Sequence, residues 1–297
     1  MTREISVVLD GYSYTECPRW HEGRLWFADF YTHQVVSCRE NGSDVRVEAE
    51  VPHQPSGLGW LPDGRLLVVS MRNSRLLRRE QSGELVEHAD LTAYVTGHPN
   101  DMVVDERGRA YVGNFGFDLM AGAPISTASL LRVDPDGSVE VVAEDLLFPN
   151  GAAIAANGTL VVSETFGNRI AAFDVADDGS LENRRAWAQF GPVPDTTDVG
   201  EALGQLSVAP DGLCLDADGL VWAADALNGR VVRVREGGEI VEEIACGSGV
   251  FACMLGGEDG RTLFMSSAPD FDEHARSAAR EARVLAVRVD VPHAGRP

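Results

Sequence analysis

Short apolar runs recur along the whole chain, and each run follows a turn-forming glycine. The runs are rich in Leu, Val and aromatic residues and are bounded by Gly, Pro and Asp, which is typical of buried β-strands. The glycines stand about 40 to 60 residues apart, a spacing characteristic of repeat architectures. They are Gly23, Gly64, Gly108, Gly158, Gly219 and Gly260.

Each repeat accommodates four short strands. The second copy shows them most clearly, at residues 57–60, 66–69, 75–78 and 85–87. Clusters of Pro, Asp, Ser and Gly separate these runs, and only residues 273–283 carry a helical pattern. Four-stranded sheets repeated around an axis make a β-propeller, so six copies predict an all-β, six-bladed β-propeller with four strands per blade. A solenoid of shorter repeats is the alternative, and the four-strand grouping disfavours it.

The last repeat lacks a strand, whereas the N-terminus has one to spare. Apolar runs in the final copy lie near residue 255 and at 262–266 and 284–289, and none follows them. Residues 5–9 form a strand-like run outside any repeat. We therefore expect the N-terminal strand to complete the last blade and close the ring, within a single domain over residues 1–297.

Composition excludes several classes of function. All 25 basic side chains are arginine, which rules out a lysine Schiff base and a P-loop. The formal charge of −21 disfavours nucleic acid and anionic membrane surfaces as partners. The N-terminal residues lack an apolar signal-peptide core, and the 5 cysteines lack metal-ligand spacing. These features predict a cytoplasmic protein with free thiols, and nothing in the sequence indicates an oligomeric state.

Aligning the repeats places a set of polar residues on the axis. The residue eight positions before each turn glycine lies on the first strand, which lines the channel of a propeller. Aligning Trp20 with Trp60 supplies the equivalent in the first copy. This axial ring consists of Glu16, Ser56, Asn100, Asn150, Asp211 and Ala252. Converging carboxylate and amide oxygens favour a hard divalent cation, Ca²⁺ first, with Mg²⁺, Mn²⁺ and Zn²⁺ as alternatives. A hydrogen-bonded polar plug is the competing interpretation.

A second polar ring lies six residues after each turn glycine. This strand-end ring consists of Asp29, Ser70, Asn114, Glu164, Asp225 and Ser266. Its members either orient the axial residues or cap the turns that follow. The three longest insertions, at residues 115–129, 191–209 and 268–282, emerge on the same face, which indicates a ligand-binding end of the propeller.

Motifs at the axial positions resemble a known family. They are Glu16-Cys17-Pro18-Arg19-Trp20, Asn100-Asp101, Asn150-Gly151 and the run 211–216. The chain resembles the senescence-marker-protein/gluconolactonase (regucalcin-like) family over nearly its whole length. That resemblance implies one divalent ion held by Glu16, Asn150 and Asp211, with Asn100 contacting substrate and Asp211 acting as general base. It also implies hydrolysis of lactones, or of organophosphate esters in a related branch.

Two departures from the family pattern concern the substrate. His98 stands where sugar lactonases of the family carry an arginine, and the segment 114–118 keeps only Asp118 of an expected acidic loop while adding Phe115 and Phe117. We therefore count His98, Phe117 and Asp118 with Asn100 as candidate substrate-binding residues. Three interpretations of His98 stay open: it donates a hydrogen bond to the substrate, it acts as a second base, or it has no part in the reaction. The pocket is expected to suit a substrate less polar than a plain sugar lactone.

The sequence thus predicts a metal-dependent lactone hydrolase in which Asp211 deprotonates the attacking water. A phosphotriesterase-type hydrolase, or a lyase or isomerase of specialised metabolism, would use the same site. A non-enzymatic calcium-binding propeller is the third reading. No Gly-x-Ser-x-Gly elbow is present, which disfavours a serine hydrolase. Cys17 and Cys214 are expected to pack between blades rather than to react.

Overall fold

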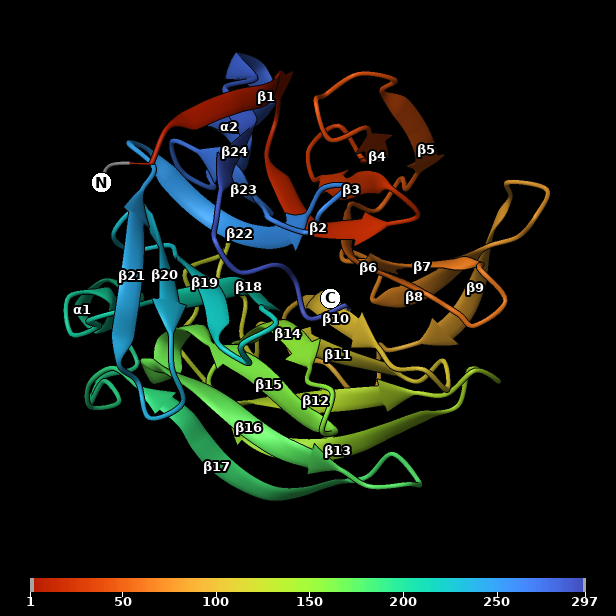
Figure 1. The fold of residues 1–297 in the computed structure, drawn as a ribbon. Helices are drawn as coiled ribbons and strands as arrows, with labels where there is room; N and C mark the ends of the chain where they lie inside the picture. The colour runs from red at the N-terminus through yellow and green to blue at the C-terminus, as the bar shows by residue number, and fades with distance from the viewer. Residues whose placement is uncertain (1–2, 296–297) are drawn as a thin grey trace.

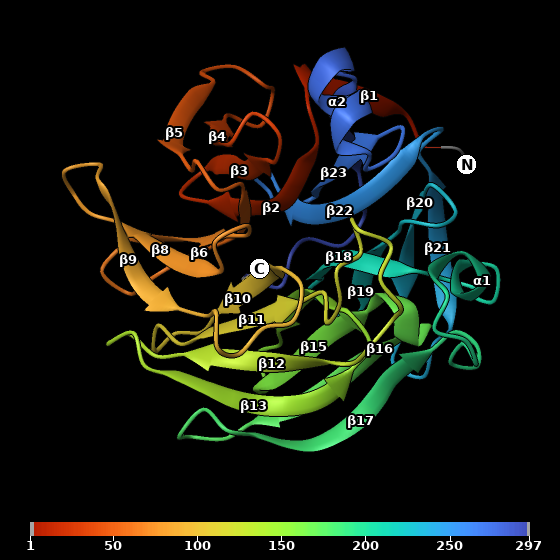
Figure 2. The same ribbon diagram turned by 180° about the vertical axis from the view of Figure 1, so that it is seen from behind.

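Six four-stranded antiparallel sheets surround a common axis in the computed structural model, which describes residues 3–295 (Figures 1 and 2). Blade one comprises β2 (Thr15–His21), β3 (Arg24–Asp29), β4 (Gln34–Cys38) and β5 (Arg46–Glu50). Blade two comprises β6 (Pro55–Trp60), β7 (Leu66–Ser70), β8 (Arg75–Arg79) and β9 (Leu85–Asp90). Blade three comprises β10 (Pro99–Val104), β11 (Ala110–Asn114), β12 (Ala128–Val133) and β13 (Val139–Leu146). Blade four comprises β14 (Pro149–Ile154), β15 (Thr159–Glu164), β16 (Arg169–Val175) and β17 (Leu181–Gln189). Blade five comprises β18 (Pro210–Leu215), β19 (Val221–Asp225), β20 (Arg230–Val234) and β21 (Ile240–Ala245). The prediction of a six-bladed propeller is confirmed.

The two ends of the chain share the sixth blade. Its order is β1-β24-β23-β22, with bounds β1 (Ile5–Tyr12), β24 (Ala282–Arg288), β23 (Thr262–Ala268) and β22 (Gly249–Gly256). Ile5 pairs with Val287 in an antiparallel ladder, so the N-terminal strand closes the ring as expected. Figure 1 shows this red strand beside blue β24. Residues 1–2 and 296–297 of the expected 1–297 domain lie outside the described residues.

Each inner strand is irregular just where an axial residue stands. In blades two to five this strand begins with proline, which pairs with the last residue of the second strand, as Pro149 does with Glu164. A register shift follows in every blade. Proline suits this position because the first strand residue need not donate to the ladder, and a bulge re-aims the side chain beside it. Glu16, Asn100, Asn150 and Asp211 are each the second residue of their strand.

Glycine follows the axial residue where neighbouring inner strands touch. A Cβ at Gly151 would lie 2.6 Å from Gly212 Cα, and a Cβ at Gly212 would lie 2.4 Å from Ala252 Cβ. No side chain fits at such distances. The Asn-Gly and Asp-Gly motifs therefore reflect the close approach of blades at the axis.

Helical structure is confined to the connections between strands. The helices are α1 (Val199–Leu203) and α2 (Glu273–Ala279), with a 3₁₀ turn at Thr165–Gly167. The expected helix at 273–283 is shorter than its sequence pattern, because residues from Ala282 onward join β24. Asp272 caps α2 by accepting from Ala275 N. No helix within residues 3–295 is long and apolar enough to cross a membrane.

Apolar side chains fill the spaces between successive blades. Trp26 and Val35 of blade one, for example, are buried with Leu58 and Val68 of blade two. The 5 cysteines are free. Cys214 is fully buried, and its sulfur accepts a hydrogen bond from Leu255 N in the next blade at 3.3 Å. This arrangement agrees with the prediction that the cysteines pack between blades.

Candidate active site

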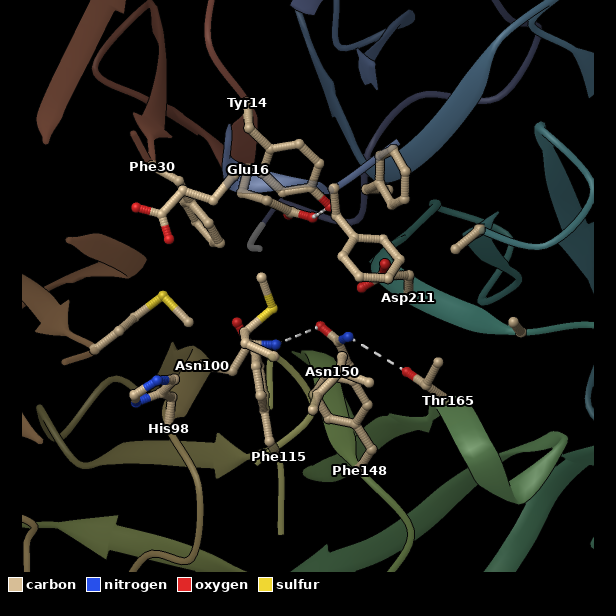
Figure 3. A pocket seen from close by; sticks show the side chains of 18 of the residues that line it. Tyr14, Glu16, Phe30, His98, Asn100, Phe115, Phe148, Asn150, Thr165 and Asp211 are labelled. Atoms are coloured by element: carbon tan, nitrogen blue, oxygen red, sulfur yellow. Dashed lines mark hydrogen bonds between the residues drawn. The ribbon is translucent and has the colours of Figure 1, made fainter. Parts of the chain in front are cut away.

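A cavity of about 480 Å³ opens at one end of the propeller axis. Four residues of the axial ring line it, and Figure 3 shows them converging from four blades: Glu16, Asn100, Asn150 and Asp211. The insertions in blades three and four meet beside it, where Ile125 N donates to Thr197 O at 2.8 Å. The segment between β11 and β12 lies in front of the sheets in Figure 2. The sequence predicted the ligand-binding end of the propeller on this same face.

The two axial carboxylates are almost completely buried. Glu16 is 8% exposed and Asp211 is 7% exposed. Burial raises the pKa of Glu16 to about 8, against the hydrogen bond that Cys17 N donates to it at 2.9 Å. Burial raises the pKa of Asp211 well above its usual range, and the negative charge of Glu16 raises it further. Each group therefore resists ionisation unless a positive charge comes close.

The protein supplies too little positive charge at this place. Asp101, beside the axis, forms a buried ion pair with Arg19 at 2.6 Å, so that guanidinium is already neutralised. Among the described residues, no ion pair involves Glu16 or Asp211. Ionisation of both would leave a charge of about −2 on the axis, which one divalent cation balances. The donor set fits such an ion.

The site differs from metal centres built only from ionisable side chains. Residues 3–295 contain no cluster of three or more His, Cys, Asp or Glu suited to a metal. The axis combines two carboxylates with carboxamide oxygens instead. An oxygen-only set of this kind suits a hard cation such as Ca²⁺ or Mg²⁺ better than Zn²⁺.

A directional chain of hydrogen bonds orients the axial amides. Ser56 Oγ donates to Asn100 Oδ1 at 3.0 Å, and Asn100 Nδ2 donates to Asn150 Oδ1 at 3.0 Å. Asn150 Nδ2 then donates to Thr165 Oγ1 at 3.3 Å, and Thr165 Oγ1 donates to Pro210 O at 2.9 Å. The carbonyl of Pro210 can only accept, so Thr165 donates its single hydroxyl proton to it. Asn150 consequently directs its amide nitrogen to Thr165 and its oxygen away from it.

The strand-end ring caps backbone rather than lining the cavity. Asp29 Oδ1 accepts from Tyr14 N at 2.9 Å, and Asp225 Oδ1 accepts from Ala209 N at 3.1 Å. In the same way Glu164 Oε2 accepts from Leu147 N at 2.9 Å. The capped groups lie in the segments before the inner strands and not in the turns that follow, so these contacts match neither expectation in its simple form. These residues hold the segments that enter the inner strands.

The candidate substrate-binding residues do not all reach the cavity. Asn100 and His98 line it, and burial lowers the pKa of His98. Phe117 is buried behind the lining, with its ring centroid 5.7 Å from that of Phe166. Asp118 is exposed outside the cavity, where its Oδ1 accepts from Ala121 N at 3.0 Å. Of the expected aromatic pair, only Phe115 lines the cavity.

Sequence reasoning missed most of the cavity wall. Eight Phe and Tyr side chains line the cavity, and Tyr31 and Phe271 stand at its mouth. We call the other six the aromatic wall: Tyr14, Phe30, Phe115, Phe148, Phe166 and Phe251. The rings pack on one another, with centroids 4.5 Å apart for Phe115 and Phe148 and 5.0 Å apart for Tyr14 and Phe251.

The repeat alignment does contain a signal for these residues. Positions two before the axial ring supply the lining residues Tyr14, Gln54, His98, Phe148 and Ala209. Positions one after the strand-end ring supply Phe30, Met71, Phe115, Thr165 and Ala226. Both sets could have been read from the same alignment that identified the axial ring.

Two contacts tie the sixth blade across the mouth of the cavity. Arg72 Nη2 lies 2.6 Å from Glu273 Oε1 on α2, which joins blade two to blade six. Tyr31 Oη donates to Phe271 O at 2.6 Å, which joins blade one to the same segment. Arg72, Glu273, Tyr31 and Phe271 all line the cavity.

The chain is similar to several known proteins over nearly its whole length. Residues 14–269 match the family described as SMP-30/gluconolactonase/LRE-like region. A 6-deoxy-6-sulfogluconolactonase of Pseudomonas putida is 27% identical over 294 residues, covering 95% of this chain and 93% of the relative. A calcium-binding protein, regucalcin, from Agrobacterium tumefaciens has a similar fold, with a TM-score of 0.79, 18% identity and coverage of 100% and 97%. A gluconolactonase structure from Xanthomonas campestris gives a TM-score of 0.74 at 23% identity, with coverage of 98% and 90%. The family resemblance of the sequence is confirmed.

Proposed function

The chain belongs to the SMP-30/gluconolactonase/LRE-like family, and on that basis we propose that it is a metal-dependent lactone hydrolase. The observation that carries the proposal is the pair of buried carboxylates, Glu16 and Asp211, at the base of a cavity of about 480 Å³, neither of which forms an ion pair within residues 3–295. The names of its relatives, which include a 6-deoxy-6-sulfogluconolactonase, support the reaction.

Glu16, Asn150 and Asp211 are the proposed ligands of one divalent ion. Calcium is the first candidate, supported by the calcium-binding relative from Agrobacterium tumefaciens, and Mg²⁺, Mn²⁺ and Zn²⁺ are alternatives. A bound ion of this kind supplies Lewis-acid polarisation of an ester carbonyl and lowers the pKa of water. Asn150 Oδ1 accepts only from Asn100 and has a second lone pair, so it can serve as a ligand.

Asp211 is the proposed general base. Its carboxylate takes a proton from the attacking water while the water oxygen bonds to the lactone carbonyl carbon. The ring C–O bond then breaks, its oxygen takes up a proton, and the product is an open-chain hydroxy acid. Asn100 and His98 line the cavity beside the axis and contact the substrate carbonyl or its substituents.

Phe117 and Asp118 would act less directly. Phe117 packs against the outer side of Phe148 and Phe166 and so positions the aromatic wall. The negative charge of Asp118 raises the pKa of His98, against the stronger effect of burial. The substrate is proposed to be less polar than a plain sugar lactone.

We propose a single domain that acts on a small lactone or ester in the cytoplasm, without a nucleic-acid or membrane partner. The charge of −21 and the free state of all 5 cysteines support these assignments.

A lactone panel assayed with and without chelator tests the proposal. Asp211→Asn should lower kcat by about 10²- to 10⁴-fold, the usual contribution of a general base. Asp177→Asn, on an exposed turn, is the matched control. Full activity of the Asp211→Asn protein, or of metal-free protein, on every lactone would contradict the proposal. Turnover of an aryl phosphotriester alone would favour the phosphotriesterase reading, and ion binding without any turnover would favour a binding protein.

A further inference from the structure

The chemistry of the cavity changes sharply between its base and its walls. Oxygen and nitrogen atoms concentrate on the axis, whereas the aromatic wall surrounds the space above it. α1 extends the apolar lining with Val199 and Leu203, both partly exposed. A ligand whose ester reaches Glu16 and Asp211 therefore places most of its remaining atoms against apolar side chains.

Most polar side chains of the lining other than His98 already have hydrogen-bond or ion-pair partners. At the base, the amides of Asn100 and Asn150 are engaged in the chain that ends at Thr165. At the mouth, Arg72 Nε donates to Gln54 Oε1 at 2.9 Å, while its Nη2 contacts the Glu273 carboxylate.

Few groups remain for the hydroxyls of a substrate. Gln54 Nε2 points to Met71 Sδ at 3.3 Å, and Tyr31 Oη is used by Phe271 O. A polyhydroxylated ring would leave water without replacement hydrogen bonds, which disfavours its binding.

The lining is also unsuited to an anionic substituent. Arg72 is its one arginine among the described residues, and Glu273 neutralises it. His98 has a pKa lowered by burial and is uncharged at neutral pH. At the base, the proposed divalent ion would balance the two axial carboxylates and leave no net positive charge. Away from the axis, an acidic group on the substrate would find no unpaired cationic side chain in the described lining.

We propose that the substrate is a neutral lactone carrying an alkyl or aryl substituent, with the ester on the axis and the substituent against the aromatic wall. This inference rests on the proposed function and specifies the substrate class of the same site. Packing of the rings at 4.5 to 5.9 Å provides a rigid apolar surface for that substituent. Burial of each added methylene favours binding by about 0.8 kcal/mol, or about fourfold.

Matched six-membered rings provide the test: δ-valerolactone, δ-decanolactone, 3,4-dihydrocoumarin, D-glucono-1,5-lactone and a δ-lactone whose chain ends in a carboxylate. We expect kcat/KM for δ-decanolactone and dihydrocoumarin to exceed that for the glucono and carboxylate lactones by on the order of 10²-fold. Equal or faster hydrolysis of the glucono or carboxylate lactone overturns the substrate assignment. Failure to hydrolyse any ring overturns the proposed function instead, so the two failures are distinguishable.

A variant of the apolar lining contributed by α1 tests the placement of the substituent. Leu203→Asn should lower the ratio of δ-decanolactone to δ-valerolactone hydrolysis by about fourfold or more, because it replaces part of the apolar lining by an amide. Val193→Asn is the matched control, since Val193 is 41% exposed and does not line the cavity. An unchanged ratio in a Leu203→Asn protein whose thermal unfolding matches that of the wild type would contradict the placement. An equal drop in the control would do the same.

Discussion

Thr165 Oγ1 accepts a hydrogen bond from Asn150 Nδ2 at 3.3 Å while giving its own proton to Pro210 O. The hydroxyl thus selects one of the two orientations of the Asn150 amide. Its effect passes onward, because Asn150 Oδ1 then accepts from Asn100 Nδ2. One threonine in the fourth blade thus contributes, with Ser56 and Asp211, to which atoms the two axial amides present to the centre of the site.

Removing this hydroxyl should weaken metal binding. Thr165→Val eliminates the acceptor for Asn150 Nδ2, and we expect calcium affinity to fall by about 10- to 100-fold, as for other residues that orient metal ligands. Thr165→Ser should restore it. Titration calorimetry on chelator-treated protein measures the affinity. Thr159→Val on β15 is the control, and a loss equal to that of Thr165→Val would indicate general damage to the blade.

Metal binding and stability should be linked through the axial carboxylates. Calcium at 100 times its Kd should stabilise the wild type by about 2.7 kcal/mol, because it binds only the folded protein. Glu16→Gln removes one of two buried, uncompensated carboxylates. We expect this variant to be at least as stable as the metal-free wild type but to gain little from calcium. Thermal unfolding with and without the ion decides this, and an unaltered calcium response would exclude Glu16 as a ligand.

The buried ion pair beside the axis should matter far more than the exposed one at the mouth. Arg19→Met would leave Asp101 charged and without its partner, which costs about 3 to 5 kcal/mol. Arg72→Met breaks an ion pair with side chains 40% and 46% exposed, worth about 0 to 1 kcal/mol. Urea denaturation of the two variants gives the comparison. Similar free energies of unfolding would show that Arg19 is not needed to compensate the buried charge.

Histidine burial should make the protein less stable in mild acid. Desolvation and the positive charge of Arg78 lower the pKa of His88. The folded state therefore takes up this proton at a lower pH than the unfolded state does. Stability from this group is complete above the unfolded pKa of about 6.5 and is lost as pH falls toward the folded pKa.

The variant His88→Gln isolates this contribution, because the other titrating groups cancel in the difference. Between pH 7.5 and 5.5 the wild type should lose more free energy of unfolding than the variant does. Urea denaturation at the two pH values measures both losses. Parallel losses in the two proteins would mean that His88 does not contribute.

The repeat pattern alone was enough to predict the blades, the closing strand and the axial ring. Short apolar runs and glycine turns are visible in the local sequence, and aligning the six copies assigned Glu16, Asn100, Asn150 and Asp211 to one place on the axis. The same alignment holds the positions of Tyr14 and Phe30, although only the structure showed that these positions line the cavity.

The tertiary structure decided the distances between blades and the burial of the side chains between them. Phe117 and Asp118 carry suitable side chains, yet the course of the insertion turns one behind the wall and the other to solvent. The length of α2 was decided by strand pairing of the residues that follow it, Ala282 with β1 and Arg283 onward with β23. The direction of the amide chain and the pairing of Arg19 with Asp101 join residues far apart in sequence. Local pattern determines which element a residue occupies, whereas burial, charge balance and hydrogen-bond direction depend on the partners that the closed ring brings to it.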